Sequence, residues 1–277
     1  MARKDLIQRN TAIFSEMGQV IDAVASPNCK VLVVANPANT NCLVALQECV
    51  RIPSKNFVAL TYLDHQRAKG QIAQRLGVPP NSVTNVTIWG NHSETQVPDA
   101  LSDGQLLGRN GERLPLELMF TGDDIDWVQH EFVSVVQNRG KEVIAARGSS
   151  SALSAAMSIA DCLKKWLVTG TDEGETISLA IYNDRGYYNV EEGIVFSFPC
   201  ECRSGEWIVK EGLELSDKVM QAIRVTKDEL LNERDDAMEL IAASRPRKGS
   251  MSTASSTMSL TSSESEGESM PTQLSKI

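Results

Sequence analysis

The segment KVLVVAN, residues 30–36, is continuously apolar between its lysine and its asparagine and contains three valines. Such a run is typical of a strand buried on both faces of a parallel sheet, because a strand with one wet face alternates apolar and polar residues. Helices must then cover both faces. Upstream, Ile7, Ile13, Phe14, Val20 and Ile21 recur at roughly helical spacing. The sequence therefore predicts a helix followed by a buried strand, the pattern of an α/β fold.

The same pattern continues along the chain. The segments NFVAL (56–60) and VTNVTIWG (83–90) are further strand candidates. A helix over about residues 64–76 is predicted between them, because Gly77 and two prolines follow it. We therefore expect three parallel strands joined by crossover helices.

After Pro98 the pattern changes to short strands and a long predicted helix, roughly residues 124–147, with its apolar residues on one stripe. This predicts a second lobe of α+β type. Thr226 and Glu229 have the spacing of a capping box, which predicts the start of a final helix. The other predicted elements are a helix over about 150–168, strands near 176–182, 193–202 and 206–210, and the end of the final helix near Ala243.

The formal net charge is −9, from 27 Lys and Arg against 36 Asp and Glu. Nucleic acids and anionic membrane surfaces attract positively charged proteins, so neither is the expected partner. A small anionic substrate would need local arginines instead. The charge thus directs attention to small-molecule chemistry.

The chain starts with MARKDLIQRN, which lacks the apolar stretch of a signal peptide, and no run of about 18 apolar residues could span a bilayer. We expect a cytoplasmic protein. Its six cysteines show neither the paired spacing of a zinc site nor the density of a disulfide scaffold. We expect reduced, mostly buried thiols and no metal.

From Arg245 onward the sequence is rich in Ser and Thr and nearly free of large apolar residues. Such a segment cannot bury enough apolar surface to offset the entropy of ordering its backbone. We therefore predict a disordered tail over residues 244–277.

Three predicted strand or helix ends carry polar residues on the same side of the expected sheet, where open α/β folds bind ligands. Asn36 ends the first strand, Asp64 and Arg67 begin a helix, and His92 follows the third strand. The spacing of Asp64 and Arg67 places both on one helix face. Together these residues supply a base, a carboxylate to orient it and a guanidinium to grip an anion.

Less specific interpretations remain open for each residue. An Asp-x-x-Arg pair is commonly a surface ion pair, and a lone loop histidine is commonly solvated or structural. Asn36 before a proline is commonly a turn residue. For the other two histidines, His65 and His130, we favour a structural or solvated role.

The motifs NPANTN, LDHQRAKGQIA and TIWGNHSETQVPD, in this order and spacing, closely resemble NAD-dependent malate dehydrogenases of the cytosolic type, within the lactate/malate dehydrogenase superfamily. The resemblance covers about residues 2–243. It implies a Rossmann-type parallel sheet followed by an α+β catalytic domain. The implied domains are residues 1–92, which hold the second half of the NAD-binding domain, and residues 93–243, which form the substrate domain.

The resemblance also implies functions for individual residues. His92 matches the histidine that takes the hydroxyl proton of malate, Asp64 matches the aspartate that stabilises the imidazolium, and Arg67 matches an arginine that binds a substrate carboxylate. The implied cofactor is NAD, the implied substrates are malate and oxaloacetate, and the implied assembly is a homodimer. Further implied contacts are Arg3 and Asn36 with substrate, and Asn10, Val34, Ala35 and Asn36 with cofactor.

A dinucleotide domain of this kind opens with a strand, a glycine-rich turn and an acidic ribose-binding residue. None of these precedes residue 30, so we expect an N-terminally truncated domain with an open strand edge and weak NAD binding. The alternative function is that of a catalytically impaired isoform or pseudoenzyme that acts as a dimerisation or interaction partner.

Overall fold

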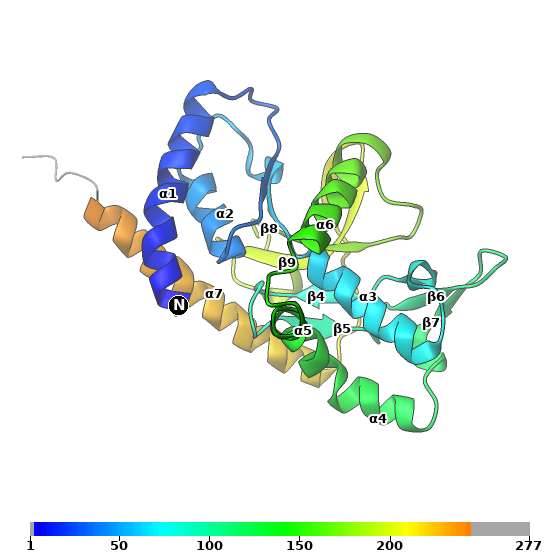
Figure 1. Ribbon diagram of the computed structural model, residues 1–277. Coiled ribbons are helices and arrows are strands. Elements are labelled where there is room, and N and C mark those ends of the chain that lie inside the picture. The colour runs from blue at the N-terminus through cyan, green and yellow to red at the C-terminus, as the bar shows by residue number, and fades with distance from the viewer. Residues whose placement is uncertain (1–2, 245–277) are drawn as a thin grey trace, which may run out of the picture. The chain divides into compact units, whose positions relative to one another are not determined.

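A computed structural model of the protein describes residues 3–244, with side chains from Asp5 onward. Helices and strands alternate over residues 3–76, and groups of successive strands and of successive helices follow (Figure 1). The helices are α1 (Arg3–Val24), α2 (Ala38–Gln47), α3 (Tyr62–Leu76), α4 (Asp123–His130), α5 (Phe132–Arg147), α6 (Ala152–Lys164) and α7 (Asp217–Ser244). The strands are β1 (Val31–Val33), β2 (Phe57–Ala59), β3 (Val83–Thr84), β4 (Thr87–Trp89), β5 (Val97–Asp99), β6 (Gln105–Leu107), β7 (Arg113–Pro115), β8 (Ile177–Tyr182), β9 (Val195–Arg203) and β10 (Glu206–Val209).

The largest sheet has the strand order β1-β2-β8-β9-β10. Strands β1 and β2 pair in parallel, with Val31 opposite Phe57, and the other neighbours are antiparallel. The predicted α/β class and its parallel sheet are therefore confirmed, in partial form. Strand β1 lies at one edge of this sheet, as the open edge predicted for it requires.

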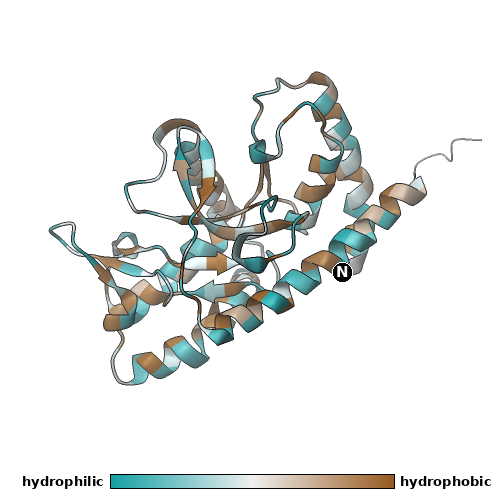
Figure 2. Ribbon diagram, turned by 180° about the vertical axis from the view of Figure 1, so that it is seen from behind, coloured by the Kyte–Doolittle hydropathy of each residue, from teal (hydrophilic) through white to brown (hydrophobic). Residues whose placement is uncertain are grey.

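Apolar side chains fill both faces of the central strands. For residues 30–36 the prediction of burial on both faces is wrong, because β1 is an edge strand whose Val31 and Leu32 are only half-buried. On one face, Val33, Phe57 and Ala59 pack with α2. On the other face, Val58 packs with β8 and β9 residues such as Phe196. Seen from behind, apolar and polar segments alternate along the helices that cover the sheet (Figure 2). This is the pattern of amphipathic helices on a buried sheet.

The prediction of a third parallel strand over residues 83–90 is wrong. This segment forms two short strands: β3 pairs with β6, and β4 pairs with β5, both antiparallel. Between them, Asn85 has a left-handed backbone conformation, with φ at 58°, which interrupts the extended chain. Because β4 is buried throughout, its apolar sequence could not distinguish a parallel from an antiparallel partner.

The helix predicted over residues 124–147 is two helices, α4 and α5, with a break at Glu131. In one straight helix, Trp127 and Phe132 would point about 140° apart, because successive residues turn by about 100°. The break lets both rings enter one core, where their centroids are 5.5 Å apart. Burial of both aromatic rings thus explains the change of direction.

The capping box predicted at Thr226 and Glu229 is also wrong, because α7 begins at Asp217 and places both residues inside the helix. Its first turns belong to the core, since Ile223 is buried and Val219 packs beside it. The predicted end near Ala243 agrees with the observed end at Ser244.

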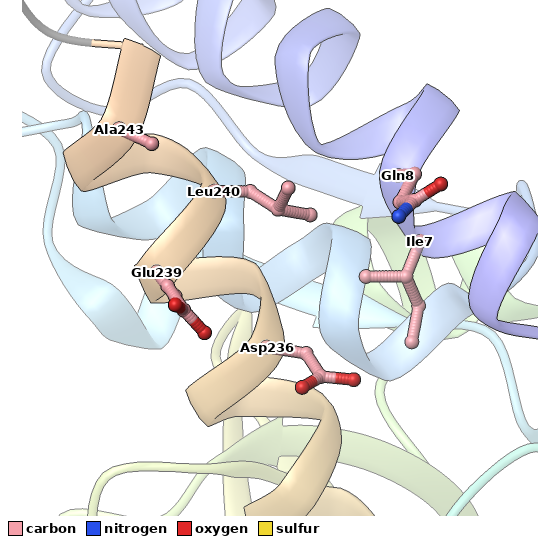
Figure 3. Close-up of a pocket in the computed structure, with 6 residues that line it drawn as sticks. All are labelled: Ile7, Gln8, Asp236, Glu239, Leu240 and Ala243. Atoms are coloured by element: carbon pink, nitrogen blue, oxygen red, sulfur yellow. The ribbon is translucent and has the colours of Figure 1, made fainter.

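Helix α7 also packs against α1 and α2 through Ile7, Val44, Ala237 and Ile241, which are buried together. Beside this contact lies a groove of about 290 Å³ between α1 and α7. Ile7 and Leu240 approach it from opposite helices, with Asp236 and Glu239 on the α7 side (Figure 3). The groove thus borders the contact that fixes α7 beside α1.

All six cysteines are free; Cys42, Cys162, Cys200 and Cys202 are buried, and Cys29 and Cys49 are half-buried. The prediction of mostly buried thiols is therefore confirmed. Within residues 3–244, no helix is both long and apolar enough to cross a membrane. The predicted boundary at residue 92 stays a prediction, and the predicted tail lies outside the described residues from position 245 onward.

We predict that Gly90→Ala destabilises the fold. Gly90 has a φ of 91°, and a Cβ added there would lie 2.2 Å from Cγ2 of Thr226 on α7. Backbone strain and overpacking together should lower the free energy of unfolding by about 3 kcal/mol. The matched control is Gly111→Ala, where φ is 84° and nothing lies within 4 Å of the added Cβ. Urea unfolding of both variants should show a clearly smaller loss for Gly111→Ala, and equal losses would contradict the steric explanation.

Candidate functional site

Helix α3 places Asp64 and Arg67 on one face, as their spacing predicts. The Asp64 side chain is fully buried, and 16% of the Arg67 side chain is exposed. Arg67 Nη1 donates a hydrogen bond to Asp64 Oδ1 over 3.1 Å, and Nη2 donates to Ser151 Oγ, just before α6, over 2.9 Å. The pair is therefore an ion pair, but one with a buried carboxylate rather than a solvated surface contact.

His92 lies on the loop between β4 and β5, and its ring reaches Asp64. Nδ1 of His92 donates a hydrogen bond to Asp64 Oδ2, the carboxylate oxygen that Arg67 does not use. The His92 side chain is 19% exposed. The structure thus brings together the three residues His92, Asp64 and Arg67, which the sequence analysis had grouped.

The charge of Asp64 depends on these two neighbours. Burial by itself would raise the pKa of the carboxyl group. The charges and hydrogen bonds of His92 and Arg67 outweigh burial and hold the pKa below its usual range. Asp64 is therefore an ionised carboxylate that can orient the imidazole of His92 and stabilise its protonated form.

The segment after β1 carries the predicted cofactor-contacting residues. Val34, Ala35 and Asn36 are exposed, which leaves this strand end accessible to a ligand. Asn10, on α1, donates from Nδ2 to the backbone oxygen of Asn36 over 2.7 Å. The structure therefore brings four of the predicted residues to one place. Arg3, which was predicted to contact the substrate, begins α1, but its side chain lies outside the described part of the chain.

The other two histidines occupy different surroundings. His65 is buried, and the backbone N–H of Ser178 donates to its Nδ1 over 3.3 Å. Burial, with Lys69 nearby, holds the pKa of His65 well below its usual value, so its ring stays neutral. His130 is exposed at the end of α4. Both placements fit the structural or solvated roles that we favoured.

The loop of His92 is held by residues that the sequence analysis missed. Its backbone N–H donates to Asn39 Oδ1 over 3.0 Å, while Thr226 and Glu229 on α7 contact the residues around it. The spacing of Thr226 and Glu229 in the sequence predicted a helix cap instead.

Among residues 3–244, no group of three or more His, Cys, Asp or Glu residues could hold a metal ion.

Family profiles match nearly the whole described part of the chain. The lactate/malate dehydrogenase NAD binding domain matches residues 1–58, and the lactate/malate dehydrogenase alpha/beta C-terminal domain matches residues 61–241. Cytoplasmic malate dehydrogenase 1 of Arabidopsis thaliana is 44% identical over 242 residues, or 87% of this chain and 71% of that protein. Cytoplasmic malate dehydrogenase of Beta vulgaris is 45% identical over 84% of this chain and 69% of that protein.

Solved structures show the same relationship. Lactate dehydrogenase of Trichomonas vaginalis, in complex with NADH and oxamate, superposes with a TM-score of 0.81 at 32% identity, over 88% of this chain and 72% of that one. Malate dehydrogenase of Naegleria fowleri gives a TM-score of 0.77 at 36% identity, over 87% of this chain and 70% of that one. The chain thus spans about 70% of the length of these relatives.

We predict that Asp64→Asn lowers the free energy of unfolding relative to the wild type, and that this loss is larger at neutral pH than at acid pH. Because the folded pKa of Asp64 lies below its unfolded value, its ionised form stabilises the fold fully above the unfolded pKa. That contribution is lost as the pH falls through the folded pKa. Removing one partner of a buried pair costs about 3 kcal/mol.

The measurement is urea unfolding of both proteins between pH 7 and pH 3, compared with the control Asp184→Asn at an exposed loop position. The stability difference for Asp64→Asn should shrink below about pH 4, near the ordinary pKa of an aspartate in an unfolded chain. A pH-independent difference would show that Asp64 is not the ionised partner described above.

Proposed function

Because the chain belongs to the lactate/malate dehydrogenase family, we propose that it interconverts malate and oxaloacetate with NAD, and that His92 is the general acid and base. The chain is homologous to NAD-dependent malate dehydrogenases and includes a match to their NAD-binding domain. The observation that best supports the proposal is the buried Asp64 carboxylate, which accepts from His92 through one oxygen and from Arg67 through the other.

In the direction of malate oxidation, the Nε2 atom of His92 takes the hydroxyl proton, because Nδ1 already donates to Asp64. NAD, when bound, supplies the acceptor for the hydride that leaves C2. Loss of this proton and hydride converts the alcohol to the ketone of oxaloacetate. Asp64 stabilises the imidazolium that results, and in the reverse direction His92 returns the proton.

Arg67 is the proposed binding residue for a substrate carboxylate. A guanidinium has five N–H donors in a planar fork, so contacts with Asp64 and Ser151 leave donors for an anion. The same two contacts fix its orientation. Arg67 therefore combines a fixed position with partial exposure next to His92. Arg3 and Asn36 are proposed as further substrate contacts.

Residues at the end of β1 fit the nicotinamide end of the cofactor. Val34 is 37% exposed and apolar, as a surface against a flat ring should be, and the Asn36 backbone is held by Asn10. We propose Asn10 and the segment from Val34 to Asn36 as cofactor contacts. The sequence contains no G-x-G-x-x-G turn, which would hold the pyrophosphate.

We further propose a homodimer in the cytoplasm. The relatives from Arabidopsis thaliana and Beta vulgaris are cytoplasmic enzymes by name. Large apolar side chains are exposed on and after α6, with Leu153 at 70% and Val168 at 78%. We propose that these side chains contribute to a subunit interface, since contiguous exposed apolar surface marks protein–protein contacts. Neither nucleic acid nor a membrane is proposed as a partner.

A second candidate function is that of an impaired enzyme that acts as an interaction partner. The observation in its favour is the position of β1, which pairs with β2 on one side and forms the sheet edge on the other. An unpaired edge can add a strand from another chain. Activity measurements separate this candidate from the dehydrogenase.

We predict that the purified chain binds NADH, weakly because its sequence lacks the glycine-rich turn, and oxidises it in the presence of oxaloacetate. The measurements are the fluorescence of bound nicotinamide and the loss of NADH absorbance on the same sample. His92→Ala should lower kcat at least about a hundredfold, because proton transfer by a positioned side chain contributes that much. His130→Ala is the control, since His130 is exposed on α4. A folded wild-type chain that binds no NADH would instead support the second candidate, and unchanged kcat in His92→Ala would remove His92 from the mechanism.

We predict that Arg67→Ala chiefly weakens substrate binding. Loss of a charged hydrogen-bond donor should raise KM for oxaloacetate about tenfold or more, while the affinity for NADH stays unchanged. Arg67→Lys keeps the charge but not the planar fork, so it should restore binding only in part. If NADH and oxaloacetate affinities fall together, Arg67 is a structural residue.

A further inference from the structure

The loop that carries His92 depends on distant elements for its shape. Residues 90–96 join β4 to β5, and only Gly90 pairs like a strand residue, with Ser197 on β9. The backbone N–H of His92 donates to the side chain of Asn39 rather than to a strand. The direction of the His92 ring is therefore set by side chains that hold this loop from outside.

Three side chains of this loop converge on one oxygen atom of α7. Asn91 Nδ2, Ser93 Oγ and Thr95 Oγ1 donate to Glu229 Oε2 over 2.8, 2.6 and 2.6 Å. Asn91 precedes His92 and Ser93 follows it. The backbone on both sides of the histidine is thus tied to the same carboxylate, while His92 itself turns toward Asp64. Figure 1 shows α7 passing beside β4 and β5, and the hydrogen bonds above place Glu229 of this helix against the loop between them.

The same face of α7 holds the loop one turn earlier. Thr226 Oγ1 accepts from the backbone N–H of Asn91 over 2.9 Å, and the hydroxyl groups of Thr226 and Thr95 are 2.9 Å apart. Thr226 and Glu229 are three residues apart and therefore neighbours on the helix surface. The absence of a side chain at Gly90 lets the loop approach Thr226 this closely.

One turn further along, Glu233 extends the contact to α2. It is 5% exposed, accepts from Asn91 Nδ2 over 3.1 Å and also accepts from the hydroxyl group of Thr40. Thr40 follows Asn39, the residue that accepts from the His92 backbone. Glu233 therefore connects the start of α2 to the same loop.

We propose that Glu229 is a positioning residue for His92, and that its carboxylate, supported by Thr226 and Glu233, holds the loop so that the imidazole meets Asp64. The role rests on the proposed function of His92 as acid and base. Glu229 touches no reacting atom in this scheme. It acts through Asn91, Ser93 and Thr95.

An ionised carboxylate suits this position better than an amide does. Its oxygens only accept, so one oxygen can face three donors, and hydrogen bonds to a charged acceptor are stronger than neutral ones. In Glu229→Gln, one of the two positions is an NH2 group that donates. The amide therefore either places a donor against the three donors or offers them a weaker, neutral acceptor.

The test compares Glu229→Gln with Glu239→Gln, the same substitution at an exposed position further along α7. The chain has three histidines, so the imidazole signals of His92 can be followed by 1H–15N NMR as a function of pH. Contact with an ionised carboxylate favours the protonated ring. We expect the titration midpoint of His92 in Glu229→Gln to fall toward that in Asp64→Asn, and Glu239→Gln to match the wild type.

The kinetic measurement uses the same full-length chains. Misplacing a catalytic group by about 1 Å can cost as much as a hundredfold in rate, so kcat should fall about tenfold or more in Glu229→Gln while NADH affinity stays unchanged. If the wild type shows no turnover, the proposed function fails, and the His92 titration still decides whether Glu229 positions the ring. A midpoint equal to that of the wild type in a folded Glu229→Gln would overturn the positioning role.

Ser93→Ala provides a milder variant in case Glu229→Gln does not fold. It removes one of the three donors and leaves the carboxylate in place. We expect a smaller shift of the His92 midpoint in the same direction. The double variant should shift the midpoint by less than the sum of the two single shifts, because both changes break the same contact. If the two shifts add, or if Ser93→Ala causes no shift, then the shared hydrogen bonds to Glu229 do not position His92.

Discussion

The carboxylate of Asp64 is the group on which the candidate site depends. It is fully buried and ionised, a combination that is strongly unfavourable unless each oxygen meets a charged or donating partner. His92 and Arg67 supply those partners from different parts of the chain. The need to pair one buried charge therefore draws together α3, the loop after β4 and, through Ser151, the start of α6.

The residues of the candidate site could be predicted from the sequence, because each of them follows a recognisable strand or lies at the start of a helix. KVLVVAN predicted a buried strand, and β1 forms there and pairs in parallel with β2, although only Val33 of β1 is fully buried. Asp64, Arg67 and His92 were grouped because the ends of such strands meet at one edge of a sheet. The structure brings the three side chains together, although β4, the strand before His92, lies outside the sheet that contains β1 and β2.

The predictions failed where the partner of a segment decides its structure. The strand over residues 83–90 was apolar enough to be buried, but nothing in it specifies β5 and β6 as antiparallel partners. Thr226 and Glu229 have the spacing of a helix cap, yet they lie inside α7 and bind a loop far away in sequence. Local spacing carries no information about such contacts, whereas the fold brings them together.

The hydrogen bonds between α7 and the His92 loop (residues 90–96) also affect the order in which parts of the protein can fold. These hydrogen bonds join residues 131 to 142 positions apart, whereas His92 and Asp64 are separated by 28. Contacts between distant positions form slowly, because long stretches of chain must be closed into loops first. During synthesis the imidazole and its carboxylate emerge early, and the helix that fixes their loop emerges well after them. The site is thus completed only by a late segment of the chain, so a nascent protein can contain every proposed catalytic residue before it holds them in a working arrangement.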